Sequence, residues 1–325
     1  MRTLYSLVIS FLLLSSVRAP AYAEASSGRQ DQHVIDSLQL VIEEAKHDTS
    51  VCSAYISWGE QVYLNDADTA LILWRKGYDI AKENLAAASP LVNKRYQSTM
   101  AEASNNMGVI YEKYGDIKRG LEYYDRSLRT YEEIDDKEGA AMALNNIAII
   151  YINQGDIDEG LKYFHNSLKI REEIGDKYGI ANSLNNIGLI YNDKGDTEKG
   201  LEYFRKSLNI KKEIGDKSGM AISLQHIGGS LCELDSVEKG IGLLKSALQI
   251  SKELKDGHWM GYSCNIISNW YFNIKMIDSA EYYADLSLKI AQDLDFPLSI
   301  QGPAFLLFHI YRKQGKYQNL YQRNM

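Results

Sequence analysis

Paired asparagines recur at a fixed spacing in this sequence. The pairs lie forty residues apart, at Asn105-Asn106, Asn145-Asn146 and Asn185-Asn186. A side-chain amide donates and accepts hydrogen bonds at once. A ladder of amides can therefore bind the backbone of an extended peptide, whatever the charge of that peptide. We therefore expect a peptide-binding face that also includes Asn182, Gln225, His226 and Asn269. The alternative is that these amides are only solvated or cap a neighbouring turn.

Residues for catalysis or metal binding show no comparable spacing. The six histidines are scattered, without H-x-x-x-H or Cys/His ligand spacing. The chain contains no G-x-S-x-G motif, no P-loop and no dinucleotide-binding glycine fingerprint. Acidic pairs such as Glu132-Glu133 are typical of solvated outer helix faces. We therefore predict a protein that is not an enzyme, with no catalytic residue, no metal and no cofactor.

The asparagine pairs lie in blocks that repeat every forty residues. Two successive blocks, from Asn145 to Leu224, are identical at 23 of 40 positions without a gap. A fixed period of about 20–50 residues is typical of a solenoid that is built from stacked units. The elements that position the asparagines are therefore expected to be stacked repeats.

Each block is predicted to fold as two helices. In the second block, Leu184, Ile187 and Tyr191 recur at helical spacing. Gly195-Asp196 then ends the first helix and caps the next, and Gly215-Asp216 closes the second in the same way. The second helix is expected to turn five residues inward: Gly200, Tyr203, Phe204, Leu208 and Ile214.

Small residues coincide where the two helices of a block should cross. The pairs are Gly108 with Gly120, Ala148 with Gly160, and Gly188 with Gly200. An internal glycine costs a helix about 1 kcal/mol relative to alanine. Its recurrence in register therefore indicates that close packing of the helix backbones offsets this cost.

A run of residues in the second block resembles the signature of the tetratricopeptide repeat family, with Gly200 where alanine is usual. The run consists of Leu184, Ile187-Gly188, Tyr191, Gly195-Asp196, Gly200, Phe204 and Ser207-Leu208. The forty-residue form, with an acidic GDK turn, is similar to repeats of the LGN/Pins scaffolds and of bacterial sensor-regulator proteins. The resemblance implies an all-α fold, a right-handed superhelical α-solenoid of antiparallel helix pairs whose first helices line a concave wall.

The same resemblance implies that asparagines on this wall contact a bound peptide, which would give that role to Asn106, Asn146 and Asn186. A wall that binds an acidic C-terminal peptide needs Lys or Arg. Only Lys113 lies in a plausible place. An acidic C-terminal peptide is therefore not the expected partner.

How well each segment matches the forty-residue repeat suggests how the chain is divided into domains. Residues 105–304 are expected to form five 40-residue repeats, preceded at 33–104 by an N-terminal brace helix and a divergent repeat. Residues 24–32 are polar and are expected to form a flexible leader. Residues 305–325 match an incomplete terminal repeat that stops inside its second helix. Either 317–325 forms a short stub, or the natural product continues.

The first 23 residues are typical of a secretory signal peptide. They combine Arg2, an apolar run from Leu4 to Val17, and the small-residue site Ala21-Tyr22-Ala23. The run is shorter than the ~20 residues that a membrane span needs, although an uncleaved signal anchor is the alternative. We expect export to the periplasm, or secretion, and no membrane span after signal cleavage.

The net charge of the chain limits the kinds of partner that it can bind. Signal cleavage would lower the formal charge from −7 to −9, because it removes Arg2 and Arg18 and no acid. An acidic protein is a poor ligand for nucleic acid or for an anionic membrane surface.

Of the three cysteines, Cys232 and Cys264 either form a disulfide after export or, like Cys52, are small buried side chains.

These observations favour an exported, non-enzymatic scaffold that binds a protein or an extended peptide in a concave groove. It would be the sensing or interaction module of a bacterial signalling system. The alternative is a free-standing periplasmic or secreted adaptor with no signalling role. The two differ in what would follow Met325, because a sensor needs a membrane span and none lies downstream of the signal segment.

Overall fold

The computed structural model describes residues 28–44, 47–294 and 297–316, and every regular element in these ranges is a helix. The described chain divides into two compact units, 28–183 and 184–316. The segment predicted as a signal peptide and the predicted C-terminal stub, 317–325, lie outside the described residues. The all-α prediction is confirmed for the residues that are described.

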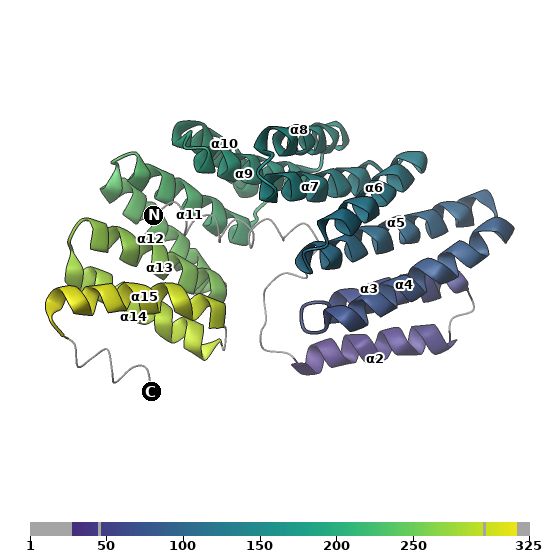
Figure 1. The fold of residues 1–325 in the computed structure, drawn as a ribbon, viewed down its shortest axis with the longest axis horizontal. Helices are drawn as coiled ribbons and strands as arrows, with labels where there is room; N and C mark the ends of the chain where they lie inside the picture. The colour runs from purple at the N-terminus through teal and green to yellow at the C-terminus, as the bar shows by residue number, and fades with distance from the viewer. Residues whose placement is uncertain (1–27, 45–46, 295–296, 317–325) are drawn as a thin grey trace. The chain divides into compact units, whose positions relative to one another are not determined.

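The first unit is a stack of antiparallel helix pairs (Figure 1). A single helix comes first, and three pairs follow it, α3 with α4, α5 with α6, and α7 with α8. The helices are α2 (Gly28–Glu44), α3 (Asp48–Val62), α4 (Ala67–Asn84), the 3₁₀ turn η2 (Leu85–Ala87), α5 (Pro90–Lys113), α6 (Ile117–Glu133), α7 (Lys137–Asn153) and α8 (Ile157–Ile174). The predicted brace helix is α2, which already begins at Gly28, within the segment expected to be a leader.

The second unit continues the same alternation of helices. Its boundary with the first unit falls between Ser183 and Leu184, inside α9 (Lys177–Asp193). It contains α10 (Thr197–Glu213), α11 (Lys217–Glu233), α12 (Val237–Glu253), α13 (Gly257–Asn273), α14 (Ile277–Asp293) and α15 (Pro297–Gln314). A forty-residue block counted from Asn105 therefore begins inside a first helix, because Asn105 lies in the second half of α5.

The Gly-Asp turns form as the sequence predicts. Gly195 and Gly215 adopt the left-handed conformation, with φ of +85° and +72°, which a residue without a Cβ tolerates best. Asp196 then accepts a hydrogen bond from the backbone N–H of Lys199 and so caps α10, and Asp216 caps α11 in the same way. Each pair of residues thus ends one helix and starts the next.

Close helix crossings form the core of each pair. A Cβ placed on Gly188 would lie 2.7 Å from the ring of Phe204 and 3.1 Å from the carbonyl oxygen of Gly200. Gly108 meets the ring of Tyr124 in the same way, also at 2.7 Å. The small residues therefore lie where the predicted crossings require them.

One predicted core residue is exposed. Ile214 keeps 36% of its surface accessible, because it is the C-cap of α10 and lies beyond the last helical turn that faces the core. The other residues that were expected to point inward from α10 are buried or half-buried. The three cysteines are buried and free, so the described structure contains no Cys232–Cys264 disulfide.

Candidate functional site

A polar cavity of about 230 Å³ opens in the first unit among α3, α5, α6 and α7. Two of the predicted peptide-binding residues, Asn105 and Asn106, form part of its lining. The other lining residues are Glu60, Ser98, Glu102, Tyr131, Asp136, Glu138, Gly139 and Met142. Two successive first helices, α5 and α7, thus contribute to one cavity, together with α3 of the divergent repeat.

Local sequence explains how Tyr131 comes to line the cavity. Asp136 caps α7 by accepting a 2.9 Å hydrogen bond from the backbone N–H of Gly139. The ring of Tyr131 lies directly against Gly139, where a Cβ would collide with it. The glycine is therefore what allows an aromatic side chain from α6 to reach the start of α7.

The cavity is negatively charged. Four of its lining residues are acids: Glu60, Glu102, Asp136 and Glu138. The pKa of the Tyr131 hydroxyl is raised well above its usual value, first by burial and then by the charges of Glu102, Asp136 and Glu60. A cationic group would therefore be favoured in this cavity.

The asparagines beside the cavity connect successive first helices. The side-chain amide of Asn146 on α7 donates a 2.9 Å hydrogen bond to the Oδ1 atom of Asn105 on α5. Asn106 donates to the carboxylate of Glu60 on α3, at 3.4 Å. Asn105, Asn106, Asn145 and Asn146 expose only 2–4% of their surfaces. The sequence pattern placed these amides on the right helices, but it did not reveal that two of them pair with one another.

The remaining predicted residues differ in exposure. Asn185 and Gln225 are buried, whereas Asn182, Asn186 and His226 are half-buried. Asn269 is exposed, and its amide donates to the backbone oxygen of Asn265 in its own helix, α13. Peptide contact stays a prediction for all of them.

Buried acceptors without a partner recur in the second unit, at a spacing of forty residues. They are the side-chain oxygens of Asn185 on α9, Gln225 on α11 and Asn265 on α13. The amide of Gln225 donates to the backbone oxygen of Trp259 at 3.2 Å and to Ser263 at 2.6 Å, which turns its own oxygen away from α13. Sequence reasoning missed Asn265, although counting forty residues on from Gln225 leads to it rather than to Asn269.

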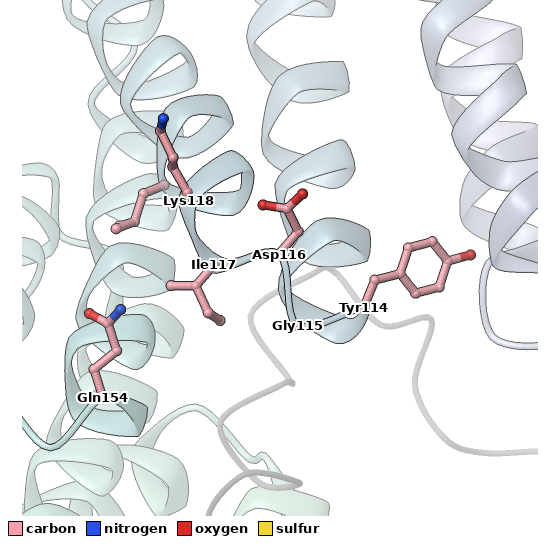
Figure 2. A pocket seen from close by; sticks show the side chains of 7 residues that line it. Tyr114, Gly115, Asp116, Ile117, Lys118 and Gln154 are labelled. Carbon is pink, nitrogen blue, oxygen red and sulfur yellow. The ribbon is translucent and has the colours of Figure 1, made fainter.

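A larger hollow, of about 700 Å³, lies at the turn between α5 and α6 and is lined by Tyr114, Gly115, Asp116, Ile117, Lys118, Leu121 and Gln154. Figure 2 shows the side chains of Tyr114, Lys118 and Gln154 pointing away from one another. Asp116 is already occupied, since it caps α6 and pairs with Arg119 at 3.1 Å. Because its groups do not converge, we regard the smaller cavity as the candidate site.

Within the described ranges, no group of three or more His, Cys, Asp or Glu side chains is arranged to hold a metal ion. Over the same ranges, no helix has the length and hydrophobicity of a membrane span.

The buried amide pair has a consequence for stability. Replacing Asn105 by Ala is expected to lower the free energy of unfolding by about 1–3 kcal/mol, because it leaves the buried amide of Asn146 without this acceptor. Urea unfolding measures the change. Asn269→Ala is the control, since an exposed side chain should alter stability by no more than about 0.5 kcal/mol. Equal stability of the two variants would show that the amide pair does not contribute to the fold.

Comparisons with known proteins identify the repeats. Residues 139–213 match the family described as tetratricopeptide repeat, which covers α7 to α10. Over these residues the predicted resemblance to the tetratricopeptide repeat family is confirmed. A search of curated proteins found no significant match.

Several solved structures share the fold. The apo form of the quorum sensor NprR from B. thuringiensis has a TM-score of 0.68 at 13% identity, over 98% of this chain and 86% of that chain. NprR in complex with its cognate peptide NprX has a TM-score of 0.57 at 15% identity, over 94% and 86%. A signal transduction ATPase with a tetratricopeptide repeat sensor, from Pyrococcus horikoshii, has a TM-score of 0.60 at 20% identity, over 99% of this chain and 52% of that chain. At these identities the likeness concerns the fold alone.

Proposed function

We propose that this protein is a non-enzymatic scaffold that binds an extended peptide or protein segment along the first helices of its repeats. The observation that carries the proposal is the cavity among α3, α5, α6 and α7, where side chains from successive repeats converge on one polar space. Such a cavity gives a bound segment several polar contacts from different repeats.

The side chains that line the cavity limit the chemical class of ligand that can bind there. Carboxylates and amide oxygens are acceptors, so a ligand that donates hydrogen bonds is complementary to them. Four acids favour a positive charge. The segment that enters this cavity therefore carries a lysine or arginine side chain, and its backbone N–H groups supply the other donors.

Two further observations support a binding role. A tetratricopeptide repeat match covers the central helices, and one structure with the same fold contains a cognate peptide. We extend peptide binding to this chain on the strength of its own cavity, because the identity to that structure is only 15%.

The signal-like N-terminal segment supports an exported scaffold, which would work in the periplasm or outside the cell. There it would be the sensing or interaction module of a signalling system. The alternative is a free-standing adaptor with no signalling role, which would use the same cavity.

Two pools of randomised octapeptides test the cavity. One pool carries a fixed central lysine, and the other carries norleucine at that position. We expect the full chain to prefer the lysine pool, and the double variant Glu102→Gln/Glu138→Gln to lose that preference by about tenfold, since a hydrogen bond to a charged group contributes about 1.5–3 kcal/mol. Fluorescence polarisation measures the binding of both pools.

Glu132→Gln/Glu133→Gln is the matched control. It removes the same charge from exposed positions on α6 and is expected to keep the preference. If the wild type binds neither pool, the proposed function is wrong. If it binds both pools equally, the segment binds without a basic side chain in the cavity.

A further inference from the structure

One position of the repeat faces the candidate cavity from the second helix. In the first unit this position is Tyr131, which lines the cavity although only 3% of its surface is exposed. Forty residues later the same position is Arg171, and forty residues after that it is Lys211 in the second unit. A residue at this position can therefore be almost entirely covered while its tip still reaches the space beside the first helices.

Lys211 is a buried cation. It lies on α10 with 2% of its surface exposed. Its aliphatic stem lies at the start of α11, where a Cβ on Gly219 would be 2.7 Å from its Cδ atom. Burial lowers the pKa of its ammonium to about 8, although the nearby charge of Asp216 acts in the opposite direction.

The equivalent cation in the first unit is neutralised. Arg171 forms a 2.6 Å ion pair with Asp176, the residue that caps α9. Lys211 makes no ion pair or hydrogen bond with any residue that the structure describes. Asp216 directs its Oδ1 atom to the backbone N–H of Gly219, at 2.8 Å, as Asp176 does to that of Gly179, but its carboxylate acts on Lys211 only through its charge. Among the described residues of the second unit, no side chain thus forms an ion pair with this positive charge.

A second polar group near Lys211 lacks a partner. His226, on α11, stacks on the ring of Phe204 with ring centroids 4.9 Å apart, and its Nε2 atom is buried without a hydrogen bond. Burial, and after it the charge of Lys211, lowers the pKa of His226 to about 3, so the imidazole is neutral at pH 7. With its proton on Nε2, the ring can donate one hydrogen bond beside the ammonium.

We propose that Lys211 and His226 form a carboxylate-binding site, which receives an acidic group of the peptide that the scaffold holds. The inference rests on the proposed function and adds the chemistry of a second ligand group. The Lys211 ammonium binds one carboxylate oxygen, and the Nε2–H group of His226 donates to the other. A carboxylate here neutralises a buried cation and gives a buried donor its partner, and both effects favour binding.

The carboxylate has two sources, an aspartate or glutamate side chain or the C-terminus of the peptide. The acidic C-terminal peptide that the sequence did not favour becomes a candidate again, because the cation that would bind it lies on a second helix rather than on the first helices. Lys211 lies on a second helix, and its long side chain reaches the next first helix from there.

Binding of four octapeptide pools to the full chain tests the site. Each pool carries a fixed central glutamate or glutamine, with either a free C-terminal carboxylate or a C-terminal amide. We expect at least one carboxylate to improve binding by tenfold or more over the glutamine amide pool, and Lys211→Met to abolish that gain. Improvement by central glutamate assigns a side chain as the source, and improvement by the free C-terminus assigns the terminal group.

Lys212→Met is the matched control, since it removes the same charge from an exposed neighbour on α10 and should keep the gain. Circular dichroism and the urea midpoint verify that Lys211→Met is folded. If the wild type binds the glutamine amide pool as tightly as the acidic pools, the carboxylate site is wrong and peptide binding stands. A gain that survives in Lys211→Met also rejects the site. If no pool binds the wild type, the proposed function fails together with this inference.

Discussion

Replacing Gly240 by Ala is expected to lower the free energy of unfolding by about 1–3 kcal/mol, because the added methyl group overpacks a helix crossing. A Cβ on Gly240 would lie 2.5 Å from the backbone oxygen of Gly228 and would collide with the sulfur of Cys232. A backbone oxygen cannot rotate away as a flexible side chain can, so α11 and α12 would have to move apart. Urea unfolding of the full chain, followed by circular dichroism, measures the change.

Gly242 provides a control on the same helix. A Cβ there meets no atom within 4 Å, so Gly242→Ala should raise stability by about 0.5–1 kcal/mol through helix propensity alone. Gly228 and Gly229 on α11 differ in the same way. A Cβ on Gly228 would lie 2.8 Å from the backbone oxygen of Gly240, whereas a Cβ on Gly229 would meet no atom within 4 Å. Equal effects of the two substitutions on α12 would mean that its glycines have no role in the crossing.

This crossing shows why the fold could be predicted from sequence. A glycine without a role in packing has no reason to recur in register every forty residues, so its recurrence indicates a helix contact. The Gly-Asp turns are predictable for a similar reason, because a left-handed residue followed by a capping side chain is a local requirement. Even the variant turn at Asp235-Ser236 keeps the left-handed conformation, with φ of +58° at Asp235, although Ser236 makes no side-chain cap.

The candidate site was less predictable, because periodicity assigns a residue to a helix face but does not name its partner. Asn105 and Asn146 lie in different blocks, and only the packing of α5 against α7 shows that their amides bond to each other. Gln225 lies at the position that asparagine holds in the earlier blocks, yet it reaches the backbone of α13 because its side chain is longer. Contacts between repeats depend on side-chain length and direction, which the repeat pattern does not specify.

Lys211 illustrates the same limit for charge. In the sequence it stands beside Lys212 in an ordinary charged helix, and nothing local separates the two. In the structure Lys212 is exposed and Lys211 is buried, because α10 turns one of the two neighbours toward α11. Only the packing of the two helices shows that Lys212 is solvated and that Lys211 is a candidate for binding a carboxylate.

Replacing Lys211 by Met is expected to raise the free energy of unfolding at pH 7 by up to about 3 kcal/mol. Burial lowers the pKa of the ammonium from 10.5 to about 8 in the folded state, and each pKa unit corresponds to about 1.4 kcal/mol. Below pH 8 the lysine is charged in both states, so the folded protein bears the whole cost of burying it. Urea unfolding of wild type and variant, from pH 7 to 10.5, measures the difference.

The pH dependence has a definite sign. Between pH 8 and 10.5 the folded state releases the proton first, so the stability of the wild type rises relative to that of Lys211→Met. The two curves should converge near pH 10.5, where the lysine is neutral in both states. Lys212→Met should match the wild type within about 0.5 kcal/mol throughout. A variant that is less stable than the wild type at pH 7, or a difference that does not change with pH, would contradict the prediction.

A cation that destabilises the free protein is understandable where binding uses it, since functional sites commonly retain groups that lower stability. A carboxylate ligand would supply the missing charge, so a saturating acidic peptide should raise the unfolding midpoint of the wild type, as any ligand of the folded state does. Lys211→Met has no charge to neutralise, so the same peptide should shift its midpoint much less. The order of stability would then depend on the ligand: the variant is the more stable protein alone, and the wild type gains more from the acidic peptide.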